Sequence, residues 1–284
     1  MKQDRIIGYG LLFPSILIMV ALVLYPIILT LIYSLQEYKL TRPDDTRFIG
    51  FNNYWAVLKS QAFIDALFNT LIIVGLVLII GLFFSIVIAL ILNKKTKISG
   101  ILTAIAILPW ALPPVVNGLL WKFIFYPGLG FFNKILFTLY LVQEPIQWLN
   151  TRYGTLVILG IIVSWRVIPF CAIVFLANLQ SIPRELYEAA RVDGASQMQM
   201  FKDITMPLLI PSLAIVLAIL TINAINVFDE AVALVGYRTL SETLIIHNYN
   251  QTFSFLNIGY GSAITYIIML GSGIIGYFYI RKIS

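Results

Sequence analysis

Six apolar stretches, each long enough to cross a lipid bilayer as a helix, dominate this sequence. A helix rises about 1.5 Å per residue, so about 20 apolar residues span the hydrocarbon core of a membrane. We expect spans over residues 10–35, 69–92, 103–125, 155–179, 208–235 and 261–280. With 60% hydrophobic and only 11% charged residues, the chain cannot cover a water-facing surface. The sequence therefore predicts an all-α membrane protein, in which residues 1–284 form a single polytopic membrane domain.

Proline residues interrupt several of these stretches. The first stretch is too long for the apolar region of a signal peptide, so we expect a retained helix, bent near Pro14 or Pro26. A proline inside a helix frees a backbone carbonyl, which a neighbour or a polar cavity must then satisfy. The third and fourth spans carry such residues at Pro109, Pro113, Pro114 and Pro169.

Basic residues indicate how the spans are oriented. With the N-terminus inside, ten lysine and arginine residues fall in the short inner segments, and seven fall in outer segments that are longer in total. Basic residues near span ends collect on the cytoplasmic side. We therefore expect both termini to be cytoplasmic.

The densest group of charges lies in the segment 183–207, "PRELYEAARVDGASQMQMFKDITMP". The pattern predicts two short helices joined at Gly194, where the first helix stops. Ser196, followed three residues later by Gln199, is typical of a capping box that begins the second helix. With the N-terminus inside, this segment is cytoplasmic.

The first of these short helices is amphipathic. Leu186, Ala189 and Ala190 share one face, opposite its charged side chains. The apolar face is too small to bind lipid well, but its two alanines let another protein approach the backbone closely. Two interpretations follow: a helix that docks on a partner, or a capped amphipathic helix lying under its own bundle.

The identities of the residues in this segment are informative. Glu188-Ala189-Ala190, Asp193-Gly194-Ala195, Phe201, Ile204, Pro207 and Pro211 resemble the cytoplasmic EAA loop of ABC importer permeases. In that family this loop is the coupling helix, which inserts into a groove on the ATP-binding subunit. The resemblance implies that residues 183–205 couple this chain to an ATPase. The implied contact residues are Leu186, Glu188, Ala189, Ala190, Arg191, Asp193, Gly194 and Phe201.

Other stretches resemble the carbohydrate permeases of the same group, of the maltose/trehalose and glycerol-phosphate type. They are "FIGFNNYWAVLKSQAFIDALFNT" (48–70), "LPWALPPVVNGLLWKFIFYPGLGFFNKIL" (108–136), "INVFDEAVALV" (225–235) and "SETLIIHNYNQTFSFLNIGYGSAI" (241–264). The usual Gly-Gly-Pro after the fifth span is replaced by Gly236-Tyr237-Arg238. The resemblance implies a type I ABC importer permease architecture with a core transmembrane region at 69–280.

The same resemblance implies a set of partners. They are two ABC ATPase subunits, a second homologous permease, an extracellular solute-binding protein, a sugar and the lipid bilayer of a prokaryotic cell membrane. The chain has no Gly-x-x-x-x-Gly-Lys-Ser/Thr phosphate loop. We therefore expect ATP and Mg to bind the partner subunits, and we expect no cofactor, no nucleic acid and no enzymatic activity in this chain.

Polar residues within the spans are candidates for the substrate pathway, because an unpaired polar group in hydrocarbon is unfavourable. The candidates are Asn117, Trp121, Arg166, Asn223, Asn226, Asp229 and Glu230. Amides and an indole ring suit a sugar, which needs hydrogen bonds and tolerates stacking. Hydrogen bonds between helices are an equal alternative for the asparagines. Arg166 needs an anion, either a buried carboxylate (Asp229 or Glu230) or a charged substrate group such as a phosphate ester.

Two other classes of function fit less well. An ion-coupled secondary transporter would show repeated halves and an acidic relay within the membrane, and neither is apparent. An intramembrane enzyme needs paired aspartates, a Ser–His arrangement or a metal cluster at membrane depth. The single histidine, His247, falls in an outer loop, and the single cysteine, Cys171, cannot form a disulfide within the chain or a Cys-based metal site. We therefore expect no catalytic residues and no metal site.

Overall fold

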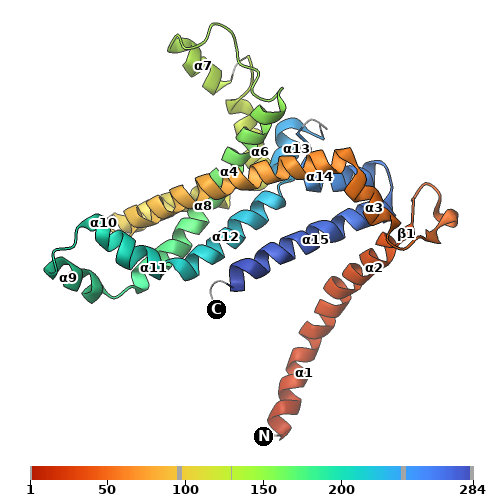
Figure 1. Cartoon of the computed structure of the whole chain (residues 1–284), viewed down its shortest axis with the longest axis horizontal. Helices are drawn as coiled ribbons and strands as arrows, with labels where there is room; N and C mark the ends of the chain where they lie inside the picture. The colour runs from red at the N-terminus through yellow and green to blue at the C-terminus, as the bar shows by residue number, and fades with distance from the viewer. Residues whose placement is uncertain (1, 95–97, 129, 238–240, 282–284) are drawn as a thin grey trace. The chain divides into compact units, whose positions relative to one another are not determined.

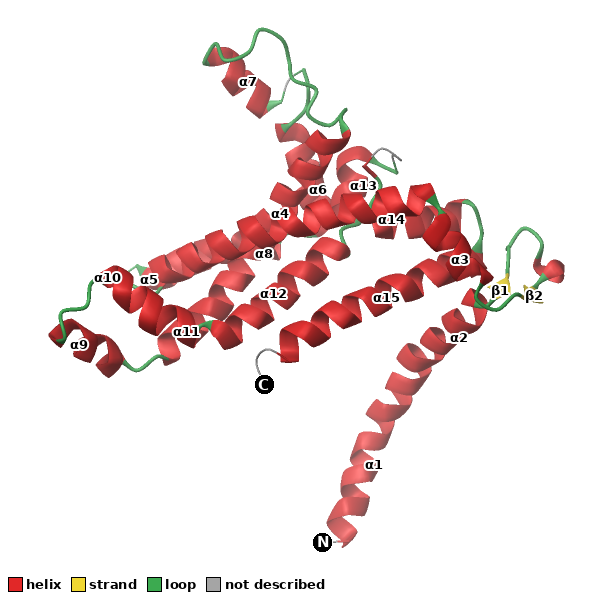
Figure 2. Ribbon diagram, in the orientation of Figure 1, coloured by secondary structure: helices red, strands yellow, loops and turns green. Residues whose placement is uncertain are grey.

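The computed structural model describes residues 2–94, 98–128, 130–237 and 241–281, and these residues are mainly helical (Figures 1 and 2). The α-helices are α1 (Lys2–Met19), α2 (Tyr25–Ser34), α3 (Asn52–Lys59), α4 (Gln61–Leu92), α5 (Ser99–Ile107), α6 (Pro114–Ile124), α7 (Phe131–Thr138), α8 (Arg152–Ser181), α9 (Arg184–Val192), α10 (Gln197–Met200), α11 (Met206–Leu208), α12 (Ile210–Ile225), α13 (Asp229–Val235), α14 (Leu244–Tyr249) and α15 (Ile258–Arg281). The π-helical turns are Val20–Leu24, Phe201–Thr205 and Asn250–Ser254, and the 3₁₀ turns are Pro43–Asp45 and Leu108–Ala111. The strands β1 (Gln36–Glu37) and β2 (Arg47–Phe48) pair antiparallel.

Within the described residues, 4 helical segments are long and apolar enough to cross a membrane. They are Leu11–Ser34, Gln61–Leu92, Arg152–Ser181 and Ile258–Tyr279. Two bent pairs raise the number to 6 if each pair is one span. These segments match the expected spans in order and in approximate position.

The structure divides the expected span over 103–125 into two helices at the prolines that the sequence places within it. Ser99–Ala111 and Pro114–Ile124 meet at an angle of 92°. Leu112, which precedes Pro113, has an extended conformation with ψ 133°, because a following proline disfavours the helical region. Pro113 and Pro114 then begin α6, where a missing N–H costs little.

The expected helix over 208–235 is wrong at its C-terminal end. Helix α12 ends at Ile225, and α13 begins only at Asp229. The two carboxylates of Asp229 and Glu230 lie in the first turn of α13, where the helix dipole favours negative charge. The intervening Val227 carbonyl accepts a hydrogen bond of 3.1 Å from the Thr243 hydroxyl. A second bend, of 68°, separates Gln197–Leu208 from α12.

Of the two prolines in the first span, Pro26 lies next to a local change in helix type. A π-helical turn covers Val20–Leu24, and the Tyr25 N–H donates to the carbonyl of Val20. Pro26 follows directly and has no N–H for the carbonyl one turn before it. The expected irregularity therefore lies next to Pro26, and the helix continues to Ser34.

The described chain forms two compact units, residues 1–64 with 247–270, and residues 65–246 with 271–284. In the first unit, buried Asn53 donates to the carbonyls of Ser34 (2.9 Å) and Gln36 (2.8 Å). The Gly259 N–H donates to the Tyr38 carbonyl at 2.9 Å, and a Cβ at Gly259 would collide with the carbonyl of Gln36. Backbone contacts thus fasten the β1 region to the start of α15.

The core of the second unit surrounds α8. Its buried members include Leu159, Ile162, Phe175 and the thiol of Cys171. Helix α4 passes close to α8, because a Cβ at Gly160 would lie 2.8 Å from Cβ of Leu76. Close packing of this kind stabilises helices in a membrane, where lipid tails are as apolar as the side chains.

Polar side chains tie the segment 242–244 to α4. The Asn69 amide donates to the Glu242 carbonyl at 2.8 Å and accepts from Arg152 Nε at 2.7 Å. The hydroxyl of Thr70 accepts from the Leu244 N–H at 2.9 Å. These bonds satisfy backbone groups of an irregular segment that would otherwise be buried unpaired.

The loop between α6 and α8 depends on one buried amide, Asn133 of α7. Its Nδ2 donates to the carbonyls of Pro127 (2.8 Å) and Ile146 (3.1 Å). Its Oδ1 accepts from Trp148 Nε1 (2.9 Å) and from the Ile146 N–H (3.3 Å). The Trp148 ring packs edge-on against Phe125 and Phe132. One side chain therefore joins both ends of the loop to α7.

We predict that Asn133→Ala destabilises this loop. The substitution removes four hydrogen bonds and leaves the Trp148 N–H and the Pro127 carbonyl unpaired. Unpaired buried groups cost about 1–3 kcal/mol, so the apparent Tm of the purified protein should fall by roughly 3–10 °C. Asn150→Ala is the control, because exposed Asn150 bonds only to Gln147 among the hydrogen bonds described for its side chain. Equal Tm values for the two variants would contradict the role of Asn133.

Candidate functional site

The segment 183–205 folds as the sequence predicts, as a pair of short helices. Helix α9 ends in a Schellman motif: the Ala195 N–H donates to the Ala190 carbonyl at 2.9 Å, and the Gly194 N–H donates to Arg191 at 3.1 Å. Gly194 has φ +81°, a left-handed conformation that favours glycine. The Ser196 and Gln199 side chains form the expected capping box at the start of α10.

Helix α9 lies at one end of α8, and this chain buries none of its residues (Figure 1). The Leu186 side chain is 44% exposed and that of Ala189 is also exposed, whereas Ala190 is half-buried. The charged side chains in the C-terminal half of α9 and at its C-cap are also exposed: Glu188, Arg191 and Asp193. Helix α9 is therefore not buried, and its outer face presents an apolar and charged surface that is open to a partner.

One hydrogen bond fixes α9 to the helix that leads into the membrane. The Tyr187 hydroxyl lies 2.9 Å from the hydroxyl of buried Thr205. Phe201, in the π-helical turn before Thr205, is half-buried. Sequence reasoning missed two strongly exposed apolar residues beside the exposed face of α9, Val192 (88%) and Met198 (73%). The sequence pattern that could have identified them is an apolar residue near a helix end with polar neighbours.

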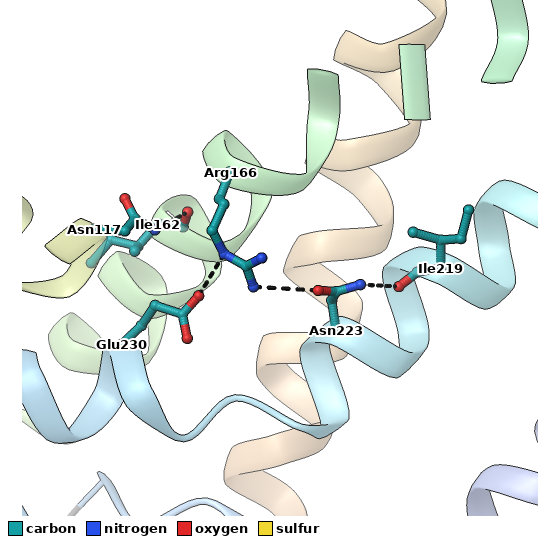
Figure 3. Close-up of polar contacts among 6 residues, drawn as sticks. All are labelled: Asn117, Ile162, Arg166, Ile219, Asn223 and Glu230. Atoms are coloured by element: carbon teal, nitrogen blue, oxygen red, sulfur yellow. Dashed lines mark hydrogen bonds and ion pairs between the residues drawn. The ribbon is translucent and has the colours of Figure 1, made fainter. Parts of the chain in front are cut away.

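A buried polar cluster lies at the break between α12 and α13 (Figure 3). Arg166 of α8 extends between Glu230 and Asn223, with Arg166 Nε 2.7 Å from Glu230 Oε1 and Nη2 3.3 Å from Asn223 Oδ1. Both charges are secluded, since the Arg166 side chain is 14% exposed and that of Glu230 is 3% exposed. Arg166 thus has Glu230 as its counter-ion, and Asp229 is exposed at the start of α13.

The break in the fifth span makes this pairing possible. In a continuous helix over 208–235, Glu230 would lie well beyond Asn223 along the axis. Because α12 ends at Ile225, the chain turns and the first turn of α13 presents Glu230 to α8 (Figure 3). Helix α6 supports α13 here, since a Cβ at Gly118 would lie 2.7 Å from the Glu230 carbonyl. The sequence signal for this arrangement was the acidic pair, which suits a helix start.

Asn117 on α6 lies near this cluster. It is fully buried, and its Nδ2 donates to the Ile162 carbonyl at 3.3 Å, one turn before Arg166 on α8. Its Oδ1 accepts no hydrogen bond from the part of the chain that the structure describes. A buried acceptor without a donor is unfavourable, so this oxygen is suited to a water molecule or a donor that arrives with a ligand.

Asn223 belongs to the cluster through its Oδ1, whereas Asn226 and Trp121 do not join it. Asn223 donates to its own helix at the Ile219 carbonyl, 2.9 Å away, and Asn226 does the same at Ile222. Asn226 is the exposed C-cap residue of α12. Trp121 is half-buried, stacked on Phe125 at 5.8 Å and edge-on to Trp165 at 5.9 Å. Among the described residues, no group of three or more His, Cys, Asp and Glu side chains could hold a metal ion.

We predict that removing either charge of the Arg166–Glu230 pair destabilises the protein. Arg166→Met or Glu230→Leu alone leaves an uncompensated buried charge, which costs about 3–5 kcal/mol. The double variant removes both charges and should recover more than half of that loss. Thermal unfolding of the four proteins in a double-mutant cycle measures the coupling, and Asp229→Asn is the control. Additive losses would contradict a direct ion pair.

Comparison with known proteins identifies a family and relatives that share this architecture. Residues 81–284 match the family described as "Binding-protein-dependent transport system inner membrane component". The trehalose/maltose transport system permease protein MalF of Thermococcus litoralis is 35% identical, over 96% of this chain and 93% of that protein. The sulfoquinovosyl glycerol transport system permease protein SmoG of Agrobacterium fabrum is 33% identical, over 99% of this chain and 91% of that protein.

Solved structures give the same result. A chain of a bacterial ABC transporter that imports the acidic polysaccharide alginate superimposes with a TM-score of 0.83 and 25% identity, over 99% of this chain and 95% of that chain. The same transporter in complex with its alginate pentasaccharide-bound periplasmic protein gives a TM-score of 0.82. The shared fold, the match over residues 81–284 and the identities over nearly the full length lead to one conclusion. This chain belongs to the family of binding-protein-dependent transport system inner membrane components.

Proposed function

We propose that this chain is one membrane subunit of an ATP-driven importer of a saccharide, and that it forms half of the translocation pathway. Similarity to trehalose/maltose and sulfoquinovosyl glycerol permeases over nearly the whole chain carries this proposal. The relatives named trehalose and arabinooligosaccharide permeases support the same substrate class. The comparisons favour this function over the alternative of an ion-coupled secondary transporter.

The energy comes from two separate ATPase subunits, which hold ATP and Mg. Residues 183–205 dock on them. The exposed surface of α9 supports this role, with apolar Leu186 and Ala189 beside charged Glu188 and Arg191. The Tyr187–Thr205 bond supports transmission, because it links α9 to the helix that continues toward the membrane. The chain itself is not an enzyme and carries no cofactor.

A second, similar permease completes the pathway, and an extracellular solute-binding protein delivers the sugar. The solved complex of an alginate transporter with its periplasmic protein supports the second of these partners. Exposed apolar faces support the first, since Ser34 is the only buried residue of the span Leu11–Ser34 within the described structure. If each bent pair is one span, the chain crosses the membrane six times and both termini lie on the same side. The bias of lysine and arginine residues toward the inner segments supports the cytoplasmic side of a prokaryotic cell membrane.

The polar cluster divides the pathway residues into two roles. Arg166 and Glu230 form a buried pair that holds α8 against α13, so their charges are not available to a neutral sugar. Asn226, the Trp121 ring and the Asn117 Oδ1, for which the described residues supply no donor, provide the contacts to substrate. Amide groups and an indole ring suit the hydroxyl groups and the apolar faces of a sugar.

We predict that Gly194→Val uncouples ATP hydrolysis from uptake. Open space surrounds Gly194, so the substitution acts through its φ of +81°, which a β-branched residue adopts with about 1–3 kcal/mol of strain. The end of α9 should then shift, and sugar uptake per ATP hydrolysed by the complex in proteoliposomes should fall about tenfold. Gly194→Asn is the matched control, because asparagine tolerates the left-handed conformation. Normal uptake by Gly194→Val would contradict the coupling assignment.

We also predict that Glu188→Lys weakens binding of the ATPase. The variant reverses a charge on the exposed surface of α9 without changing the backbone, so the ATPase should be lost during affinity purification of this chain. Glu144→Lys makes the same charge reversal at an exposed position outside residues 183–205 and serves as the control. Equal recovery of the ATPase with both variants would show that α9 is not the docking helix.

For the pathway, we predict that Asn226→Ala lowers the maximal uptake rate about fivefold or more. Loss of one hydrogen bond to substrate corresponds to about 1 kcal/mol. Thermal stability should change little, since the described bond of Asn226 is to its own helix. Thr103→Ala removes a similar bond within α5 and serves as the control. Unchanged uptake by Asn226→Ala would remove this residue from the pathway.

A further inference from the structure

Helix α7 presents an apolar surface that the transport function does not explain. Exposed side chains on α7 and directly after its end include Phe131 (65%), Leu139 (60%) and Tyr140 (95%). The inner side of α7 is fixed, because Asn133 bonds the loop on both sides and Phe132 packs on Trp148. The exposed side is therefore held in place as an apolar surface.

The exposed side of α7 is also hollowed. A groove of about 330 Å³ is lined by Phe131, Lys134, Ile135, Thr138 and Leu139. It combines an apolar floor with one ammonium group and one hydroxyl group. The segment 131–143 contains no carboxylate, and Lys134 is its only charge. This chemistry fits an apolar chain that carries a phosphate.

The position of α7 favours a lipid as the occupant of this groove. It follows α6, which is half of a bent span and has exposed apolar residues such as Phe123 (74%). Residues 125–130 connect the two helices, and six residues reach at most about 20 Å. Helix α7 therefore follows closely after the end of the span, within reach of the lipid headgroups. Tyrosine and other aromatic side chains prefer this level, and a lysine can extend toward phosphate there.

We propose that α7 lies in the membrane interface and that its groove binds a glycerophospholipid. The acyl chain contacts Phe131, Ile135 and Leu139, and the phosphate contacts the Lys134 ammonium group. The Tyr140 ring extends into the headgroup region. Through Asn133 and Trp148, the bound lipid fixes the loop 126–150 beside the end of the span.

Nitroxide labels can locate this surface in the assembled transporter, reconstituted in nanodiscs that contain phosphatidylglycerol. The labels are placed at Phe131→Cys and Leu139→Cys, in a Cys171→Ser background that removes the native thiol. Gln143→Cys is the control, at the exposed polar end of the same loop. Labels at 131 and 139 should collide more with oxygen than with a water-soluble nickel chelate, whereas the label at 143 should show the reverse. Chelate-accessible labels at 131 and 139 would place α7 in water, and labels protected from both reagents would place it against a protein. Either result overturns the proposal.

The phosphate contact has its own test. In the same nanodiscs, Lys134→Glu should weaken association of spin-labelled phosphatidylglycerol about fivefold or more, the effect of one basic residue at an anionic surface. Lys134→Arg keeps the charge and should retain binding. Neither measurement depends on uptake, so they remain informative if the substrate or the coupling partner is assigned wrongly. Unchanged lipid association in Lys134→Glu would overturn the assignment of Lys134.

Discussion

The buried pair of Arg166 and Glu230 imposes the strongest constraint on the membrane core of this protein. An unpaired guanidinium or carboxylate at this depth would cost several kcal/mol, so the backbone must bring the two groups together. A continuous fifth helix would separate them, and the chain instead ends α12 at Ile225 and restarts at Asp229. The restart places α13 against α6, with Gly118 leaving room for the Glu230 carbonyl. The ion pair, the break and the helix contact therefore depend on one another.

The irregular backbone around this pair is supported by side chains at each point. The Thr243 hydroxyl donates a hydrogen bond to the Val227 carbonyl. Two further bonds join the segment 242–244 to α4: the Asn69 amide donates to the Glu242 carbonyl, and the Leu244 N–H donates to the Thr70 hydroxyl. Non-helical backbone at membrane depth is tolerated only where such partners or a polar cavity exist. These residues are structural in role, although their polarity alone would have suggested a pathway.

Much of the fold could be predicted from the sequence, because hydrophobic length and capping chemistry are local properties. The spans, the end of α9 at Gly194 and the capping box of Ser196 and Gln199 all followed from short patterns. The prolines of the third span indicated a break near Leu112, but its 92° angle depends on tertiary partners and did not follow from the sequence. The break at Asn226–Phe228 was not predicted. For the candidate site, the residues around Arg166 could be named from polarity, but the choice of Glu230 over Asp229 depended on where α13 begins. The assignment of the coupling surface and of the substrate contacts still rests on resemblance and on the proposed experiments.

The bend at Leu209 has a mechanical consequence. The helical segment Gln197–Leu208 meets α12 at 68°. By simple geometry, only about a third of a displacement directed along the first segment lies along the axis of α12, and most of it is perpendicular. A thrust delivered at α9 would therefore swing the inner end of α12 sideways more than it would slide the helix through the bilayer. The bend would thus convert an axial displacement of Gln197–Leu208 into a mainly lateral displacement of α12.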